Sequence, residues 1–111
     1  PLVAVLAESG VVRRLLLYLL EAHRFRVLLA RDVEGLLRLL KSRPKGVILQ
    51  GEKAVEAARK VRATPEGRLA SLYLVSETPP GLLLRPLRLL HLPKPLRSQE
   101  VLKALGPLRR G

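Results

Sequence analysis

The most constraining feature of the chain is a fivefold alternation of short apolar runs with longer amphipathic segments. The run Leu2–Ala7 is continuously apolar, which is typical of a strand buried on both faces of a sheet. The next segment, from Val11 to His23, repeats apolar residues at helical spacing, with an expected inward stripe of Val12, Leu15, Leu16, Leu19 and Leu20. The same two patterns then recur, predicting strands at 25–30, 46–49, 72–75 and 89–92 and helices at 32–42, 53–63 and 98–105.

The connections between these segments are short, so successive strands are expected to be parallel and joined by right-handed crossovers. This predicts one α/β domain over residues 1–111, a doubly wound five-stranded parallel sheet with helices on both faces. The proline-rich stretch from Thr78 to Pro86 is expected to be irregular or a single helical turn, where a fourth helix would otherwise stand. The expected helix caps are Ser9 or Gly10, Asp32 and Ser98, and the last helix is expected to stop at Gly106-Pro107 before a basic tail at Arg109 and Arg110.

Composition excludes several kinds of chemistry. The chain has no cysteine, which removes disulfides, thiolate metal sites and cysteine nucleophiles, and its two histidines are too few for a zinc site. There is no glycine-rich phosphate loop, so no nucleotide cofactor is expected, and no nucleophile or base constellation indicates an enzyme. No apolar run is long enough for a membrane span and no secretory signal is visible, so a soluble cytoplasmic protein is expected. The absence of Cys, Met and Asn beside abundant Arg, Leu and Pro suggests a thermophilic source.

The formal net charge is +12, from 21 Lys and Arg against 9 Asp and Glu. Such a balance attracts nucleic acid or an anionic surface, so weak nucleic-acid contact is one open alternative. The basic residues are spread over every predicted helix, and the three aromatics offer no platform for stacking bases. A solvated basic surface without a nucleic-acid role is the other alternative.

In a parallel sheet of this kind the ligand site lies beyond the carboxyl ends of the strands. Here those ends are Ala7-Glu8, Gln50, Ser76 and Lys94. Only one of them, Glu8, is a carboxylate. Gln50 is a primary amide, which does not act as a phosphate-accepting nucleophile as a carboxylate does. The edge therefore carries polar groups but lacks an evident acceptor.

Together the alternation, the strand ends and Leu92-Pro93-Lys94-Pro95-Leu96 resemble the receiver domains of two-component response regulators, with a flavodoxin/CheY-like (βα)5 fold. The resemblance implies a degenerate phosphorylation pocket made of Ala7, Glu8, Gln50, Ser76, Lys94 and Pro95. In the family, an acidic pair that helps to bind magnesium stands where this chain has Ala7-Glu8, and the phosphoacceptor aspartate stands where it has Gln50. Ser76 matches the family's hydroxyl residue, and Lys94-Pro95 matches its lysine-proline step, whose peptide is typically cis.

The departures from the family extend beyond the acceptor. The loop after Gln50 is shorter than the family's, the fourth helix is replaced by the proline-rich stretch, and His91 stands where a signalling aromatic usually lies. The resemblance therefore implies a pseudo-receiver, that is, an atypical response regulator that signals by protein–protein interaction and without a metal or other cofactor. Basic association with nucleic acid on the same scaffold is the alternative.

Two further expectations concern Lys94 and the interaction face. Without a phosphoryl partner, Lys94 is expected to pair with Glu8 in a salt bridge, or to hold Gln50 by direct hydrogen bonds as a constitutive lock. The partner is expected to be a protein of a signalling or transcription system. A homodimer is also considered, since receivers often dimerise through the last strand and helix. The candidate faces are the first helix, with Arg13, Arg14, Tyr18 and Glu21, or the last strand and helix, with His91, Arg97 and Lys103.

Overall fold

The computed structural model describes residues 1–109 as five strands, four α-helices and three short 3₁₀ helices. Arg110, placed in the predicted basic tail, lies outside the described residues. The strands are β1 (Leu2–Ala7), β2 (Arg26–Leu29), β3 (Gly46–Gln50), β4 (Ser71–Ser76) and β5 (Leu89–Pro93). The helices are α1 (Gly10–Ala22), α2 (Val33–Leu39), α3 (Ala54–Arg62) and α4 (Ser98–Leu105), with 3₁₀ helices η1 (Leu40–Ser42), η2 (Leu82–Leu87) and η3 (Gly106–Arg109).

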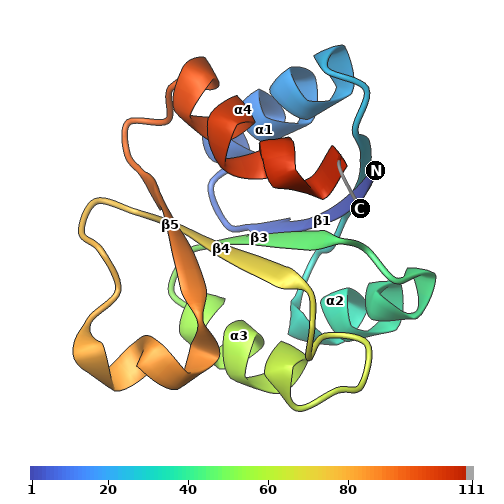
Figure 1. Ribbon diagram of the computed structural model, residues 1–111, viewed down its shortest axis with the longest axis vertical. Coiled ribbons are helices and arrows are strands. Elements are labelled where there is room, and N and C mark those ends of the chain that lie inside the picture. Colours follow the sequence, from blue (N-terminus) through green and yellow to red (C-terminus); the bar gives the residue numbers. More distant parts are fainter. Residues whose placement is uncertain (110–111) are drawn as a thin grey trace.

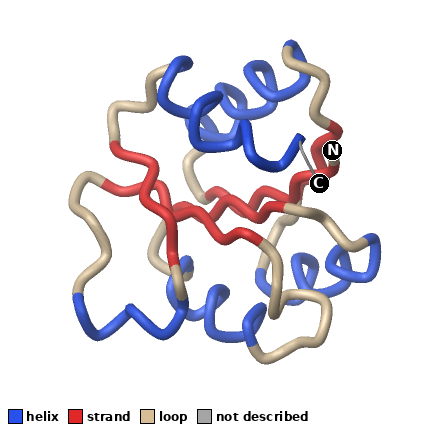
Figure 2. Tube along the Cα trace, viewed as in Figure 1, coloured by secondary structure: helices blue, strands red, loops and turns tan. Residues whose placement is uncertain are grey.

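All the strands are parallel and form one sheet in the order β2-β1-β3-β4-β5. Helices α1 and α4 cover one face, and α2, α3 and η2 cover the other (Figure 1). Figure 2 shows the same three layers, with the strands as a single central sheet between two helical layers. The predicted doubly wound fold with a reduced fourth helix is therefore confirmed.

The first strand explains why its sequence is apolar without alternation. Val3 and Val5 belong to the core under α1 and α4, whereas Ala4 and Leu6 belong to the core under α2 and α3. Successive side chains of a strand point to opposite faces, and in this sheet both faces are buried. A continuous apolar run is therefore what a central parallel strand requires.

Two of the three predicted helix caps are confirmed. The Ser9 hydroxyl accepts a hydrogen bond from Val12 N at 3.2 Å, and the Asp32 carboxylate accepts one from Gly35 N at 2.7 Å. The prediction for Ser98 is wrong. Ser98 is already helical, and Arg97 precedes the helix without any side-chain hydrogen bond to it. Arg97 has an extended backbone and is the N-cap, so the helix begins at Ser98, one residue earlier than a Ser98 cap would place it.

Three other expectations need correction. Leu15 is 39% exposed because it lies at the margin of the stripe formed by Val12, Leu16, Leu19 and Leu20. The segment containing Pro86 forms a six-residue 3₁₀ helix, longer than a single turn. The last α-helix ends at Leu105 as predicted, but the residues after it form η3, a 3₁₀ helix that buries Leu108, where only a basic tail was expected. Within residues 1–109, no helix combines the length and the hydropathy needed to cross a membrane.

Candidate functional site

The carboxyl ends of the strands meet at one edge of the sheet, as the sequence predicted. Ala7 is paired with Gln50 in the register of β1 and β3, and Ser76 is paired with Pro93 in that of β4 and β5. The backbone N–H of Lys94 donates to Ser76 O at 3.1 Å, which fixes the start of the loop after β5. The peptide between Lys94 and Pro95 is cis, as the family resemblance implied.

The Gln50 side chain is held by the loop that follows β1. Its Oε1 accepts a hydrogen bond from Ser9 N at 2.9 Å, and its own carbonyl oxygen accepts one from Glu8 N at 3.2 Å. Ser9 is also the N-cap of α1, so the amide ties the end of β3 to the start of that helix. The side-chain oxygen of Gln50 is thus already bound to a backbone N–H.

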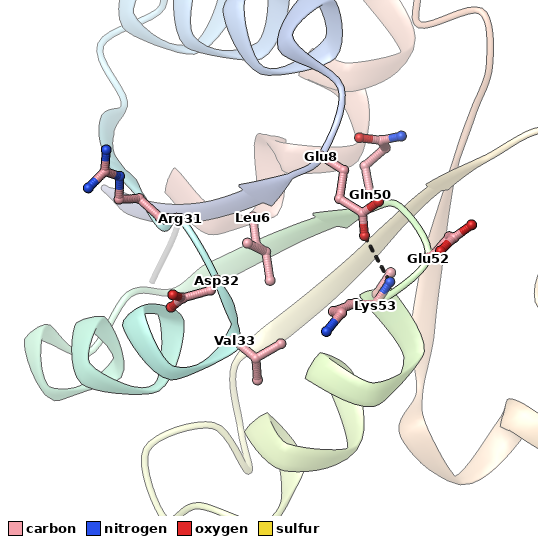
Figure 3. Close-up of a pocket in the computed structure, with 9 residues that line it drawn as sticks. Leu6, Glu8, Arg31, Asp32, Val33, Gln50, Glu52 and Lys53 are labelled. Atoms are coloured by element: carbon pink, nitrogen blue, oxygen red, sulfur yellow. Dashed lines mark hydrogen bonds between the residues drawn. The ribbon is translucent and has the colours of Figure 1, made fainter.

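The Glu8 carboxylate turns away from the sheet edge and crosses the β3–α3 loop (Figure 3). Its Oε2 accepts a hydrogen bond from Lys53 N at 3.0 Å, at the start of α3. The crossing depends on Gly51, whose φ is +119°. A Cβ at Gly51 would lie 2.5 Å from Glu8 Cγ, so only glycine allows both this backbone and this side-chain path. We call these two contacts, the hydrogen bond of Glu8 with Lys53 N and that of Gln50 with Ser9 N, the strand-end clasp.

Both predicted contacts of Lys94 are wrong. Lys94 is exposed, and neither a salt bridge to Glu8 nor a side-chain hydrogen bond to Gln50 forms. The physical reason is competition: each acceptor has a nearer backbone N–H, which supplies a hydrogen bond without immobilising a long lysine side chain.

Ser76 makes hydrogen bonds through both its hydroxyl and its carbonyl oxygen, and the carbonyl oxygen has two partners, Lys94 N and His91 Nε2. The Ser76 hydroxyl donates to Thr78 O at 2.6 Å, within its own loop. His91 Nε2 lies 2.9 Å from the Ser76 carbonyl oxygen, and because a carbonyl oxygen can only accept a hydrogen bond, Nε2 is the protonated nitrogen of this imidazole. His91 is half-buried and is paired with Leu74, so it lies on the α2/α3 face of the sheet.

The predicted interaction residues therefore do not share one face. Arg97 and Lys103 are exposed on or beside α4, on the opposite side of the sheet from His91. Arg97 lies 3.9 Å from Glu100 in an exposed ion pair one turn along the helix. Successive residues of a strand point to opposite faces of the sheet. In β5, Leu92 therefore packs in the core under α1 and α4, whereas His91 points to the other face.

A cleft of about 300 Å³ opens beside the strand-end clasp (Figure 3). Glu8 and Gln50 line it, whereas Ser76 and Lys94 do not. The sequence interpretation missed four charged residues of its wall: two follow β2, the strand end that was left out, and two follow Gln50 in the loop after β3. These residues are Arg31, Asp32, Glu52 and Lys53.

The donors at this edge do not fit the magnesium ion that the fold family uses. Ala7 offers no ligand, and the side-chain oxygens of Glu8 and Gln50 already accept backbone hydrogen bonds. Magnesium needs several oxygen ligands in a near-octahedral arrangement. Among residues 1–109, no three histidine, aspartate or glutamate side chains gather closely enough to hold a metal ion.

A second polar centre lies at the amino ends of the strands, and no sequence pattern indicates it. The Arg62 guanidinium, at the end of α3, donates to backbone carbonyl oxygens of two separate loops. Burial lowers the pKa of Arg62, and the nearby positive charge of Arg88 lowers it further. The acceptors are Leu87 O at 2.9 Å, Gly67 O at 3.0 Å, Arg68 O at 3.2 Å, Ala70 O at 2.6 Å and Arg88 O at 3.3 Å.

No protein-family model and no curated protein matches the sequence. Solved structures of receivers do match the fold. The chemotaxis response regulator CheY4 of Vibrio cholerae has a TM-score of 0.83 at 17% identity, covering 96% of this chain and 97% of that chain. A sensor protein from Polaromonas sp. JS666 has a TM-score of 0.85 at 19% identity, with 96% and 94% covered. A response regulator receiver protein from Pseudomonas putida has a TM-score of 0.79 at 22% identity, with 96% of each chain covered. The fold is therefore that of CheY-like receiver domains.

Proposed function

We propose that this chain is a receiver-like regulatory module that works without phosphorylation, by binding a protein of a signalling or transcription system. A fold alone does not define an activity, so the proposal depends on the site. The observation that carries it is the strand-end clasp. The position of the acceptor is an amide whose oxygen is bound to Ser9 N at 2.9 Å, and the remaining carboxylate, Glu8, is bound to Lys53 N.

The clasp also supports a fixed conformation. In receivers the acidic pair and the phosphoacceptor stand at the ends of β1 and β3, where the loops after these two strands begin. Here Gln50 and Glu8 hold the same two loops to each other by hydrogen bonds within the chain. Each such bond contributes on the order of 1 kcal/mol, which is enough to favour one loop arrangement severalfold. In this proposal the chain is not an enzyme and needs no cofactor.

Labelling with acetyl phosphate and magnesium tests the loss of phosphorylation. The natural chain is expected to remain unlabelled, as measured by intact mass. The double variant Ala7→Asp with Gln50→Asp introduces the two missing carboxylates. It is expected to be labelled only weakly, because Glu8 remains hydrogen-bonded to Lys53 N and the loop after β3 remains short. Labelling of the natural chain refutes the proposal. Strong labelling of the graft alone contradicts only the view that the pocket is otherwise disabled.

The first helix is the better supported of the two candidate protein-binding faces. Tyr18 is 75% exposed on α1, and Val11 and Leu15 are exposed on the same helix at positions i−7 and i−3. Arg13 is already engaged, donating to Ala7 O at 2.9 Å. The alternative face carries Arg97 and Lys103 on the α4 side and is the one through which a homodimer would form.

A comparison of two variants separates these faces. Tyr18→Ser is expected to abolish retention of the partner from native extract on the immobilised chain. Arg97→Gln with Lys103→Gln is expected to leave both retention and the mass in solution unchanged. If the α4 double variant alone loses the partner, or converts a dimer to a monomer in light scattering, the α1 assignment is wrong.

A further inference from the structure

Cationic side chains gather at the amino ends of the strands, opposite the edge that holds the strand-end clasp. The segments that lead into β2, β3, β4 and β5, together with the end of η3, hold six cations and one carboxylate, Glu66, and the first residue of β2, Arg26, adds a seventh cation. The segments at the carboxyl ends hold four cations and four carboxylates. All seven cations are exposed, and we call them the amino-end cations: Arg24, Arg26, Arg43, Lys45, Arg68, Arg88 and Arg109.

Three of these arginines occupy backbone positions that do not suit arginine. Arg24, Arg43 and Arg88 have φ values of 68°, 54° and 53°. Arg43 and Arg88 cap η1 and η2, and Arg24 follows the C-cap of α1; at such positions before a strand the left-handed conformation normally selects glycine or asparagine. Strained non-glycine residues persist mainly where function requires the side chain. Three independent turns with the same disfavoured choice at one edge indicate that the side chains themselves are needed there.

The amino-end cations are also not neutralised within the chain. The ion pairs among residues 1–109 are Lys60 with Glu56 and Arg97 with Glu100, and neither involves this edge. Several of the cations donate to backbone carbonyls, as Arg88 does to Arg68 O at 2.7 Å. Such contacts position a guanidinium without cancelling its charge.

The amino-end cations form a row across the sheet. The strand order brings Arg26 to one side, Lys45 to the centre and Arg88 to the far side. With about 4.8 Å between neighbouring strands, the row is roughly 19 Å wide. Its surface is hollowed by two grooves of about 450 and 320 Å³ that share Leu69, Ala70 and Ser71. The charged residues that line the first are Arg62, Arg68 and Arg88, and those that line the second are Arg43, Lys45 and the one carboxylate, Glu66.

From these observations we infer that the amino-end cations bind the phosphodiester backbone of a double-stranded nucleic acid. Guanidinium groups match phosphate oxygens in pairs, and six of the seven cations are arginines. A row of this width faces about six phosphates of one duplex strand, which are spaced about 3.4 Å apart along the axis. A single strand fits less well, because the aromatic rings nearest this edge, Phe25 and Tyr73, are 3% and 1% exposed and offer no stacking surface.

The binding is expected to be independent of base sequence, since phosphate contacts carry no sequence information by themselves. It is also separate from the proposed protein-binding function. The clasp lies at the opposite ends of the strands, and the substitutions tested below leave both the clasp and Tyr18 unchanged, so loss of one activity leaves the other measurable.

The test compares two doubly substituted chains with equal charge. The first carries Arg24→Gly and Arg43→Gly, at side chains that make no hydrogen bond or ion pair in residues 1–109. The control carries Arg14→Gln and Arg38→Gln, at exposed helical positions outside the row. Fluorescence anisotropy with a labelled 20-base-pair DNA duplex, at several salt concentrations, measures the affinity of each.

The glycine variant is expected to bind the duplex at least tenfold more weakly than the control in 0.1 M salt. The plot of the logarithm of its association constant against the logarithm of the salt concentration is expected to be less steep than the control's, by about two. Its melting temperature is expected to hold or rise, because glycine relieves both left-handed positions. Equal losses in the two variants overturn the inference, since they indicate diffuse attraction to net charge. Competition by polyglutamate as effective as that by unlabelled duplex also overturns it, in favour of an acidic protein partner.

Discussion

Arg62 provides the sharpest energetic prediction, because one side chain connects three parts of the chain. Its guanidinium, at the end of α3, donates to the α3–β4 loop at Gly67 and Ala70 and to the end of η2 at Leu87. Those three bonds measure 2.6 to 3.0 Å and are partly buried. The same loops carry Arg68 and Arg88, so Arg62 also positions the amino-end cations.

The magnitude follows from these three bonds. Hydrogen bonds to a charged donor contribute about 1.5–3 kcal/mol each when well buried, and about 1 kcal/mol is appropriate where water reaches the acceptors. The desolvation that lowers the pKa of Arg62 offsets part of the sum. Arg62→Ala is therefore expected to reduce the free energy of unfolding by about 2–3 kcal/mol and the melting temperature by roughly 10 °C.

Urea denaturation followed by circular dichroism, with thermal melts alongside, measures the effect. Arg59→Ala is the matched control, since Arg59 is exposed on the same helix and its side chain makes no hydrogen bond or ion pair with the described residues, 1–109. It is expected to change stability by less than about 0.5 kcal/mol. Arg62→Lys keeps the charge but lacks the planar fork, so it is expected to recover less than half of the loss. An Arg62→Ala variant as stable as the Arg59→Ala control, or full rescue by lysine, refutes the reasoning.

Three other predictions concern single positions. Gly51→Ala is expected to destabilise the chain by about 2 kcal/mol in urea denaturation, because φ is +119° and the new Cβ would collide with the side chain of Glu8. Gly67→Ala is expected to be at least as harmful in the same assay, since its Cβ would run into the backbone carbonyl of Val61. Burial raises the pKa of Tyr73, whose hydroxyl donates to a backbone carbonyl at 3.0 Å. The native state therefore holds that proton more tightly than the unfolded state, so stability is complete below about pH 10 and declines as pH rises through the raised pKa. In a Tyr18→Phe background, ultraviolet titration of the one remaining tyrosine is expected to show this delayed ionisation, and ionisation at the ordinary tyrosine pKa would contradict it.

The order of strands and helices could be predicted from the sequence because local residue patterns determine each element. Continuous apolar runs such as Leu2–Ala7 specify strands buried on both faces, and the helical spacing of Val12, Leu16 and Leu20 specifies the side that packs on them. Short connections then leave parallel strands and right-handed crossovers as the allowed topology. The edge at which Gln50 would lie follows from that topology alone.

The contacts at that edge were decided only by the tertiary structure. The sequence placed Glu8, Gln50 and Lys94 near one another but could not rank the donors competing for each acceptor. The positive φ of Gly51 opens the path by which Glu8 reaches a backbone N–H, and Lys94 is left in solvent. Such choices depend on differences of about an ångström and about 1 kcal/mol, which no residue pattern encodes.

The amino-end cations show the same division. The sequence by itself determined a net charge of +12 and an apparently even spread of basic residues. Only the parallel sheet, which brings every helix-to-strand turn to one edge, collects Arg24, Arg43 and Arg88 into a row. The sequence therefore determined the fold and the amide at Gln50, while the tertiary structure decided which charges lie together, because their proximity comes from strand order and not from spacing along the chain.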